Sequence, residues 1–140
     1  TGCDNIFLSG ADIRELRELD HEGTLRFAER GQQLFAKVAA AKQRTIAAIN
    51  GHCMGGGLDF ALACDIRIAS PTSEFAHPGA RLGIITGWGG TQRLPRFIGR
   101  TRAIEFFVTA RRLNSTEALR IGLIHAVDVS PLDYALRLSA

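Results

Sequence analysis

Three consecutive glycines, Gly55 to Gly57, and the acidic residue Asp59 form the segment of this sequence best suited to chemistry. Glycines leave backbone N–H groups uncovered by side chains. The apolar residues after them predict a short helix whose positive dipole end points at the same place. Because no Lys-Ser or Lys-Thr follows the glycines, a nucleotide phosphate is not the expected ligand. A carbonyl oxygen that becomes an enolate fits such a site better.

A second junction of this kind lies near the start of the chain, where residues 6–9 predict the end of a buried strand before Gly10 and Ala11. If the two strand ends are neighbours, the N–H groups of Ala11 and Gly56 converge on one oxygen. Two fixed donors stabilise charge that develops only in the transition state, and loss of one typically costs about 3–4 kcal/mol. The alternative is that both segments are tight turns without a chemical role.

Asp59 is the candidate acid or base beside these donors. It lies one turn into the predicted helix among apolar residues. A buried carboxylate without a partner is unfavourable, so a catalytic role is preferred to a structural one. Asp12 is interpreted as a helix N-cap, with Glu15 completing a capping box, and Asp65 as the anchor of a turn.

Most of the histidines are expected to have structural roles, and the single tryptophan has two possible roles. His77 could carry a proton near neutral pH, but a hydrogen bond to its own loop is the expected role. His52 is expected to line the substrate path or to pack, and His21 and His125 to be peripheral. Trp88 either covers a substrate pocket or packs under the next helix. No pair of His or Cys has metal-ligand spacing, so no metal is expected.

Apolar periodicity alternates between strand and helix patterns along the chain. We expect strands at residues 6–9, 45–50, 65–69, 75–77 and 122–128, and helices at 13–19, 25–42, 58–64, 92–97, 102–109, from 114 and from 132. Residues 20–23 and 78–90 are expected to be loops. Arg67 is placed on the face of its strand opposite Ile66 and Ile68. The alternation predicts one α/β domain that occupies residues 1–140.

The composition limits the classes of protein to which the chain can belong. With 46% hydrophobic residues, 22% charged residues and a net charge of +3, it is expected to fold around one core. Its scattered arginines predict a solvated surface and no nucleic-acid partner. Three cysteines, an odd number, favour a reducing compartment, which we take to be the cytoplasm. No apolar run has the length of a bilayer span, so no membrane association is expected.

Five segments together resemble the enoyl-CoA hydratase/isomerase (crotonase) superfamily. They are residues 9–15, 47–59, 63–69, 89–95 and 113–124. The resemblance runs from about residue 4 to 130 and implies a crotonase-like spiral of ββα units. It also implies acyl thioesters of coenzyme A as substrates, no further cofactor, and trimers or pairs of trimers. Earlier strands and C-terminal helices of the family are not evident, so we expect the chain to be a fragment of one domain.

The resemblance also implies a set of site residues. The thioester oxygen would sit between the amides of Ala11 and Gly56, with Asp59 as the acid or base. The residues expected to bind the substrate along its path are Ser9, Gly10, Asp12, Ile13, His52, Met54, Gly55, His77, Pro78, Gly79 and Leu82.

Two positions depart from the hydratase pattern. Hydratases of the family carry glutamates where this chain has Asp59 and Gly79. Dienoyl-CoA isomerases resemble this chain at Asp59, but they carry further acids at Gly79 and near Gly87. By analogy with a few family members that use bicarbonate, one hypothesis is that water or a small anion fills the place of the second acid.

Hydratase or isomerase chemistry on an enoyl-CoA is the reaction that we expect. A hydrolase or lyase that uses the same oxyanion site is an alternative within the family. A catalytically silent acyl-CoA binder or assembly subunit is the alternative from another class, and the missing acid at Gly79 supports it.

Overall fold

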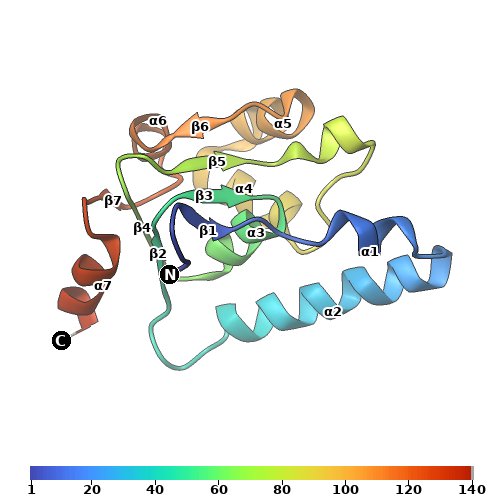
Figure 1. The fold of residues 1–140 in the computed structure, drawn as a ribbon, viewed down its shortest axis with the longest axis horizontal. Helices are drawn as coiled ribbons and strands as arrows, with labels where there is room; N and C mark the ends of the chain where they lie inside the picture. The colour runs from blue at the N-terminus through green and yellow to red at the C-terminus, as the bar shows by residue number, and fades with distance from the viewer. Residues whose placement is uncertain (140) are drawn as a thin grey trace.

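The computed structural model describes residues 1–139, in which short strands alternate with helices (Figure 1). The strands are β1 (Ile6–Leu8), β2 (Ile46–Ile49), β3 (His52–Met54), β4 (Ile66–Ala69), β5 (Glu74–Ala76), β6 (Leu113–Asn114) and β7 (Ala126–Val127). The α-helices are α1 (Ile13–Arg17), α2 (His21–Ala39), α3 (Gly56–Ala63), α4 (Gly90–Ile98), α5 (Arg100–Thr109), α6 (Ser115–Arg120) and α7 (Pro131–Ser139), and a 3₁₀-helix, η1, covers Pro78–Leu82.

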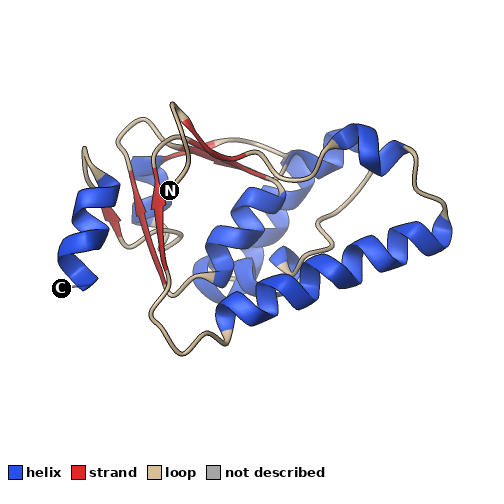
Figure 2. Ribbon diagram, turned by 60° about the horizontal axis from the view of Figure 1, so that its bottom comes forward, coloured by secondary structure: helices blue, strands red, loops and turns tan. Residues whose placement is uncertain are grey.

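The strands form two small sheets. One has the order β1-β3-β5-β6, in which only the β5–β6 pair is antiparallel, and the other has the parallel order β2-β4-β7. Helix α7, which leads to the C-terminus marked in Figure 2, packs against β2 and β4 of the second sheet, whereas the long helix α2 packs against α3. From β1 to β5 successive strands alternate between the two sheets, so β2 leads directly into β3, and the chain then turns into α3 at the edge of the first sheet.

Strand β3 is absent from the sequence-based expectation, which places no strand between residues 50 and 65. Three residues between Gly51 and Gly55 are too few for a periodic signal. The strand exists because His52–Met54 pairs in parallel with β1 on one side and β5 on the other. A Cβ on Gly51 would lie within overlap distance of the Asn5 backbone, so this close approach requires glycine.

Helix α2 begins earlier than expected. Residues 20–23 were predicted to be a loop, but Asp20 is the N-cap of α2 and its side chain accepts a hydrogen bond of 2.7 Å from the Gly23 N–H. Asp12 caps α1 as predicted, accepting from the Arg14 N–H at 2.9 Å. The capping box predicted there is wrong, because the Glu15 side chain pairs with Arg30 at 3.3 Å.

The core lies between the first sheet and helices α3 to α6. Helix α3 is almost entirely enclosed, with Leu58, Asp59 and Leu62 buried within it. All three cysteines are free thiols; Cys53 and Cys64 are buried, whereas Cys3 is exposed. Within residues 1–139, no helix combines the length and the apolar character needed to cross a bilayer.

Arg67 corrects the expectation that the arginines lie on a solvated surface. It is 0% exposed, although the alternation along β4 put it opposite Ile66 and Ile68. Strand β4 is the middle strand of its sheet, with β2 and β7 as neighbours, and both of its faces are covered. A central strand of a covered parallel sheet has no solvent face for a charged side chain.

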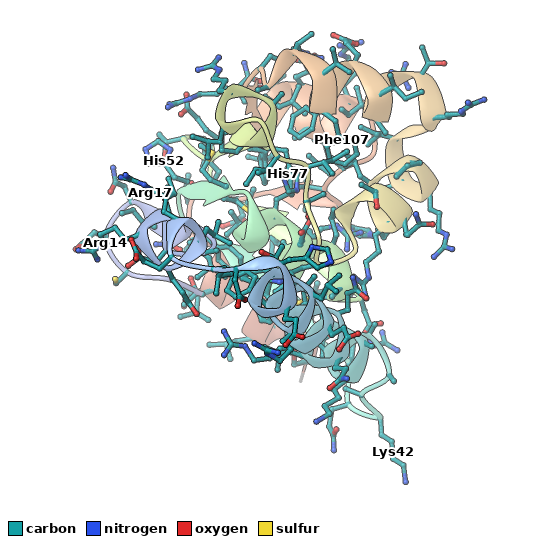
Figure 3. The ribbon with its side chains drawn as sticks, turned by 90° about the vertical axis from the view of Figure 1, so that its right-hand side faces the viewer. Arg14, Arg17, Lys42, His52, His77 and Phe107 are labelled. Carbon is teal, nitrogen blue, oxygen red and sulfur yellow. The ribbon has the colours of Figure 1, made fainter. Side chains whose placement is uncertain are left out.

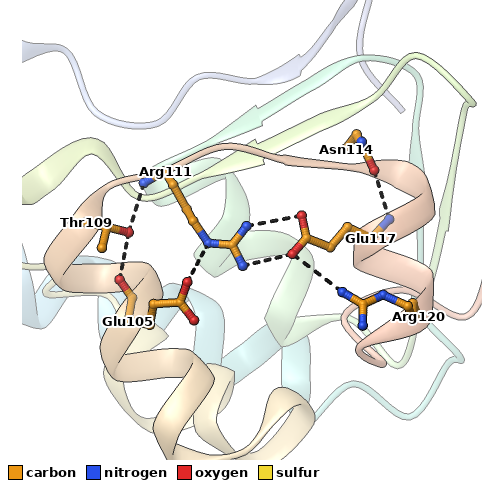
Figure 4. A network of polar contacts seen from close by, with 6 residues as sticks. All are labelled: Glu105, Thr109, Arg111, Asn114, Glu117 and Arg120. Atoms are coloured by element: carbon orange, nitrogen blue, oxygen red, sulfur yellow. Dashed lines mark hydrogen bonds and ion pairs between the residues drawn. The ribbon is translucent and has the colours of Figure 1, made fainter.

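A polar network closes the turn from α5 into α6 (Figure 4). Arg111 makes two parallel hydrogen bonds to Glu117, at 2.9 and 3.1 Å, and pairs with Glu105 at 3.0 Å. The predicted helix start at Asn114 is confirmed, since its side chain accepts from the Glu117 N–H at 2.8 Å. The carboxylate of Glu117 is engaged by Arg111 and therefore does not complete a capping box.

Candidate active site

The two predicted strand–glycine–helix junctions are neighbours. Parallel pairing of β1 with β3 brings their carboxyl ends to the same edge of the sheet. There Gly10, with a φ of +92°, approaches so closely that a Cβ on it would lie 2.7 Å from the amide nitrogen of Gly56. Any side chain at position 10 would therefore push against the start of α3.

Both candidate donors line one cavity and have no internal partner. Within residues 1–139, no hydrogen bond uses the N–H group of Ala11 or of Gly56. The two residues border a cavity of about 240 Å³. Gly56 is also the first residue of the eight-residue helix α3, whose dipole adds positive potential at this end. The cavity therefore has two unpaired amide donors next to the positive end of a helix.

Asp59 lies on the wall of the same cavity and is 1% exposed. Its Oδ1 is 2.9 Å from Nε2 of His77, and its Oδ2 accepts a hydrogen bond from the Thr86 hydroxyl. A Cβ on Gly90 would overlap with Oδ1, so the N-terminus of α4 also packs directly on this carboxylate. Burial of the charge is thus compensated by partners from two separate segments.

His77 has a different role from the one that the sequence suggested. The expected hydrogen bond to its own loop is wrong, because its side chain pairs with Asp59. Figure 3 shows His77 inside the molecule, beside Phe107. Its ring lies 5.3 Å from that of Phe107 and 6.5 Å from that of Phe106, centroid to centroid. These aromatic side chains keep the imidazole 4% exposed and aimed at the carboxylate.

The backbone fills the space beside Gly79. A Cβ at this position would lie 2.6 Å from the carbonyl oxygen of Ile84, whose own N–H donates to the Gly79 carbonyl at 3.0 Å. A glutamate could stand here only if residues 79–84 changed their path. A carbonyl oxygen in this direction also repels an anion, which argues against bicarbonate and leaves water as the hypothesis for this place.

Most of the predicted site residues meet at this cavity. Those on its wall are Ser9, Ala11, Ile13, Gly55, Gly56, Asp59, His77, Pro78, Gly79 and Leu82. Four others do not line it. Gly10 lies behind Gly56 and Asp12 caps α1, while His52 pairs with Glu74 at 3.3 Å and Met54 lies within β3.

Sequence reasoning missed Thr86 and the part of the wall that α2 provides. Thr86 lies in a glycine-rich segment without regular period, so nothing in the sequence connects it with Asp59. Thr24, Phe27 and Ala28 of α2 line the cavity because that helix runs beside the loop of residues 83–89. The predicted helix 25–42 already contained Phe27 and Ala28, but nothing in the sequence placed it beside that loop; Asp20 as an N-cap is the signal that would have added Thr24 to the helix.

The surroundings of the site are apolar. Cys53 lies on β3 near Asp59, and burial, followed by the charge of Asp59, raises the pKa of its thiol far above the usual value. This thiol is therefore protonated and is a packing residue. Among residues 1–139, no cluster of three or more His, Cys, Asp or Glu side chains is arranged to hold a metal ion.

The chain matches a known family over most of its length. The family model described as enoyl-CoA hydratase/isomerase matches residues 1–134. The chain is 42% identical over 121 residues to the short-chain-enoyl-CoA hydratase of Clostridium acetobutylicum, a match that covers 86% of this chain and 46% of that protein. It is also 42% identical over 124 residues to the crotonyl-CoA hydratase of Syntrophomonas wolfei, with 89% and 48% covered.

The fold agrees with these sequence matches. The crystal structure of an enoyl-CoA hydratase from Bacillus anthracis superposes with a TM-score of 0.93 at 37% sequence identity. The match covers 99% of this chain and 55% of that one. The chain thus spans about half the length of the relatives that it matches, and its α/β architecture is that of their fold.

Proposed function

Because this chain belongs to the enoyl-CoA hydratase/isomerase family, we propose that the full-length protein acts on an acyl thioester of coenzyme A. The observation that carries the proposal is the contact between the two glycine junctions, where Gly10 abuts the Gly56 nitrogen at the cavity that also holds Asp59. In this proposal the thioester oxygen accepts hydrogen bonds from Ala11 and Gly56. Each of these hydrogen bonds strengthens as the thioester oxygen gains negative charge in the enolate.

Asp59 is the proposed acid and base. In isomerisation its carboxylate removes a proton from C2 of a 3-enoyl-CoA, the electrons of that C–H bond move to the thioester oxygen, and Asp59 returns the proton to C4 as the double bond moves to C2–C3. In hydration it takes a proton from water, the water oxygen bonds to C3 while the electrons of the C2–C3 double bond move to the thioester oxygen, and Asp59 delivers the proton to C2. His77 and Thr86 each engage one of its oxygens and hold it in place. Since Gly79 supplies no second acid, one carboxyl group must both take and return the proton. Moving a double bond within the acyl chain needs only that.

Two optical assays on the full-length protein test the reaction. Hydration of a four-carbon 2-enoyl-CoA removes the ultraviolet absorbance of the conjugated thioester, whereas isomerisation of a 3-enoyl-CoA creates it. Release of free coenzyme A, followed with a thiol reagent, reports a hydrolase. Turnover in one of the first two assays is the expected result.

Substitution of Gly10 tests the oxyanion site itself. Gly10→Ala places a methyl group against the Gly56 nitrogen, and we expect turnover to fall by roughly a hundredfold or more. Gly122→Ala is the matched control, because Gly122 also has a positive φ, of +81°, but its Cβ would be at an ordinary 3.5 Å from the nearest atom. Equal activities of the two variants would overturn the proposed donor pair.

A catalytically silent acyl-CoA binder is the second candidate. The Ile84 carbonyl beside Gly79 favours it, since this backbone leaves no place for a second acid. Tight binding of acyl-CoA thioesters without turnover in any of the three assays would select this candidate. A trimeric assembly is part of either proposal, and sedimentation of the full-length protein measures it.

A further inference from the structure

Trp88 is wedged between two helices at the edge of the cavity. A Cβ on Gly31 of α2 or on Gly56 of α3 would overlap with its indole ring, so both helices carry glycine where they meet it. The ring lies 5.0 Å from that of Phe27 and 5.5 Å from that of Phe35, and its Nε1 donates to the Phe27 carbonyl at 3.2 Å. The indole is therefore held on several sides.

The backbone around Trp88 is also tied down. The Gln32 side chain of α2 donates to the Gly87 carbonyl at 2.8 Å, and Arg93 of α4 donates to the Trp88 carbonyl at 3.1 Å. These bonds connect the loop to helices on both sides. The position of the indole is thus fixed by contacts with both α2 and α4.

Trp88 separates the cavity from the aromatic part of the core. On one side it borders the cavity next to Gly56, the proposed oxyanion donor. Behind it lies Phe35, which is 5% exposed and packs against Phe60 at 5.6 Å. Loss of the indole would extend the cavity towards Phe35.

The remaining wall suits an alkyl chain of limited length. Ile13, Leu82, Ile84 and Ile85 line the cavity, yet each is between 47% and 64% exposed, so an apolar ligand would cover them. The volume of about 240 Å³ lies below the range of roughly 300–1,000 Å³ that is usual for drug-sized ligands. The cavity is therefore small for a ligand site, which agrees with an acyl chain of limited length.

We propose that Trp88 is the inner wall of the acyl pocket and limits the length of the acyl chain that the protein accepts. This inference rests on the proposed function, because it takes the cavity to hold the acyl group of a coenzyme A thioester. The indole meets the chain just beyond the oxyanion donors. Because Gly31 has no side chain, the indole can sit against α2 and does not extend further into the cavity. The position of the ring then sets the length of acyl chain that fits.

Two substitutions move this wall in opposite directions. Trp88→Leu removes the indole ring and opens space towards Phe35, where a longer acyl chain can be buried. Each additional buried methylene raises the affinity about fourfold. We expect the affinity for a ten-carbon acyl-CoA, relative to a four-carbon one, to rise by at least tenfold. Gly31→Ala forces the indole towards the cavity and should lower the same ratio. The double variant should behave like Trp88→Leu, since no ring remains to be displaced.

The measurement is calorimetric binding of saturated acyl-CoA thioesters of four to ten carbons to the full-length protein. Saturated thioesters need no turnover, so the result does not depend on the chemistry at Asp59. Phe97→Leu is the matched control, because Phe97 is a large ring outside the cavity wall. If Trp88→Leu fails to fold, Trp88→Phe is the second variant, and it should shift the chain-length ratio in the same direction by a smaller amount.

The outcomes separate this inference from the proposed function. A chain-length ratio that stays at the wild-type value in folded Trp88 variants overturns the role of Trp88 and leaves the proposed function standing. Absence of binding for every acyl-CoA overturns both. A shifted ratio in Trp88→Leu with an unchanged ratio in Phe97→Leu supports the inference, even where no turnover is found.

Discussion

Asp59 and Arg67 are both charged and almost completely buried, at 1% and 0% exposure, but their partners differ in kind. Asp59 lies in the first turn of α3 and is paired with two side chains, His77 and Thr86. Arg67 belongs to β4, but its guanidinium reaches the C-terminal end of the same helix, where it donates to the carbonyls of Ala61 and Cys64. An acid at the positive end and a cation at the negative end both suit the helix dipole.

The environment of Arg67 indicates a structural role. Its guanidinium donates to the carbonyls of Cys64 at 2.7 Å and Leu123 at 2.8 Å, and it lies 4.1 Å from the centre of the Phe97 ring. Burial lowers its pKa to about 10, which still leaves it charged near neutral pH. Carbonyl groups cannot exchange protons, whereas an imidazole can. The comparison teaches that burial alone does not separate the two charges; their partners do, and the partners of Asp59 suit the acid–base role that we propose for it.

Asp59→Asn gives the largest expected effect. The amide keeps the size of the carboxyl group and can still accept from Thr86, but it cannot take up a proton. We expect kcat to fall by about 10²–10⁴-fold, with little change in acyl-CoA affinity or in the denaturation midpoint. The measurements are turnover in the optical assays and thermal unfolding. Unchanged turnover would remove Asp59 from the mechanism, and Asp59 would then be a structural buried charge like Arg67.

Arg67→Met is expected to show the opposite pattern. Removal of the guanidinium leaves the carbonyls of Cys64 and Leu123 without donors, and we expect unfolding free energy to fall by about 2–4 kcal/mol. Turnover per folded molecule should stay close to wild type, since Arg67 does not border the cavity. Urea denaturation measures the loss, with the exposed Arg96→Met as control. A large loss of turnover without loss of stability would contradict the structural assignment.

The same two residues show how far the sequence leads. The glycines before an apolar helix indicated the site and Asp59, because local patterning and backbone chemistry determine them. The partners His77 and Thr86 could not be paired with it, since only the tertiary fold brings residues 18 and 27 positions away onto one carboxylate. Arg67 was misplaced because strand alternation predicts two faces but does not say that both are covered. Strand β3 was missed for a similar reason, as pairing partners define it.

The pH dependence of stability tests the structural role of the Arg67 surroundings, because His125 lies beside Arg67 and can titrate. Partial burial, followed by the nearby charge of Arg67, lowers the pKa of His125 below its ordinary value of 6.5, and its Nδ1 accepts from the Arg67 backbone N–H at 3.1 Å. The unfolded chain then binds the proton more readily. Stability should therefore decrease as the pH falls from about 6.5 through the lowered pKa.

The variant His125→Asn should flatten this decrease, because its amide can accept the same hydrogen bond without titrating. Urea denaturation midpoints between pH 7 and pH 5 measure it, and the exposed His21→Asn serves as control. Parallel pH profiles for the wild type and His125→Asn would show that the Arg67 surroundings do not titrate through His125.

The Arg111–Glu117 pair gives the smallest expected effect and tests whether burial matters to the comparison at all. These side chains are 34% and 27% exposed and form two parallel hydrogen bonds, the bidentate geometry in which a guanidinium and a carboxylate fit best. A double-mutant cycle with Arg111→Met and Glu117→Gln should nevertheless give a coupling of only about 0.2–1 kcal/mol, because water screens the pair. The hydrogen bonds from Arg111 lower the pKa of Glu117, so this contribution is present above its ordinary value of 4.5 and is lost as the pH falls through the lowered one. A coupling as large as the loss in Arg67→Met would mean that geometry, and not removal from water, decides what a charge contributes in this fold.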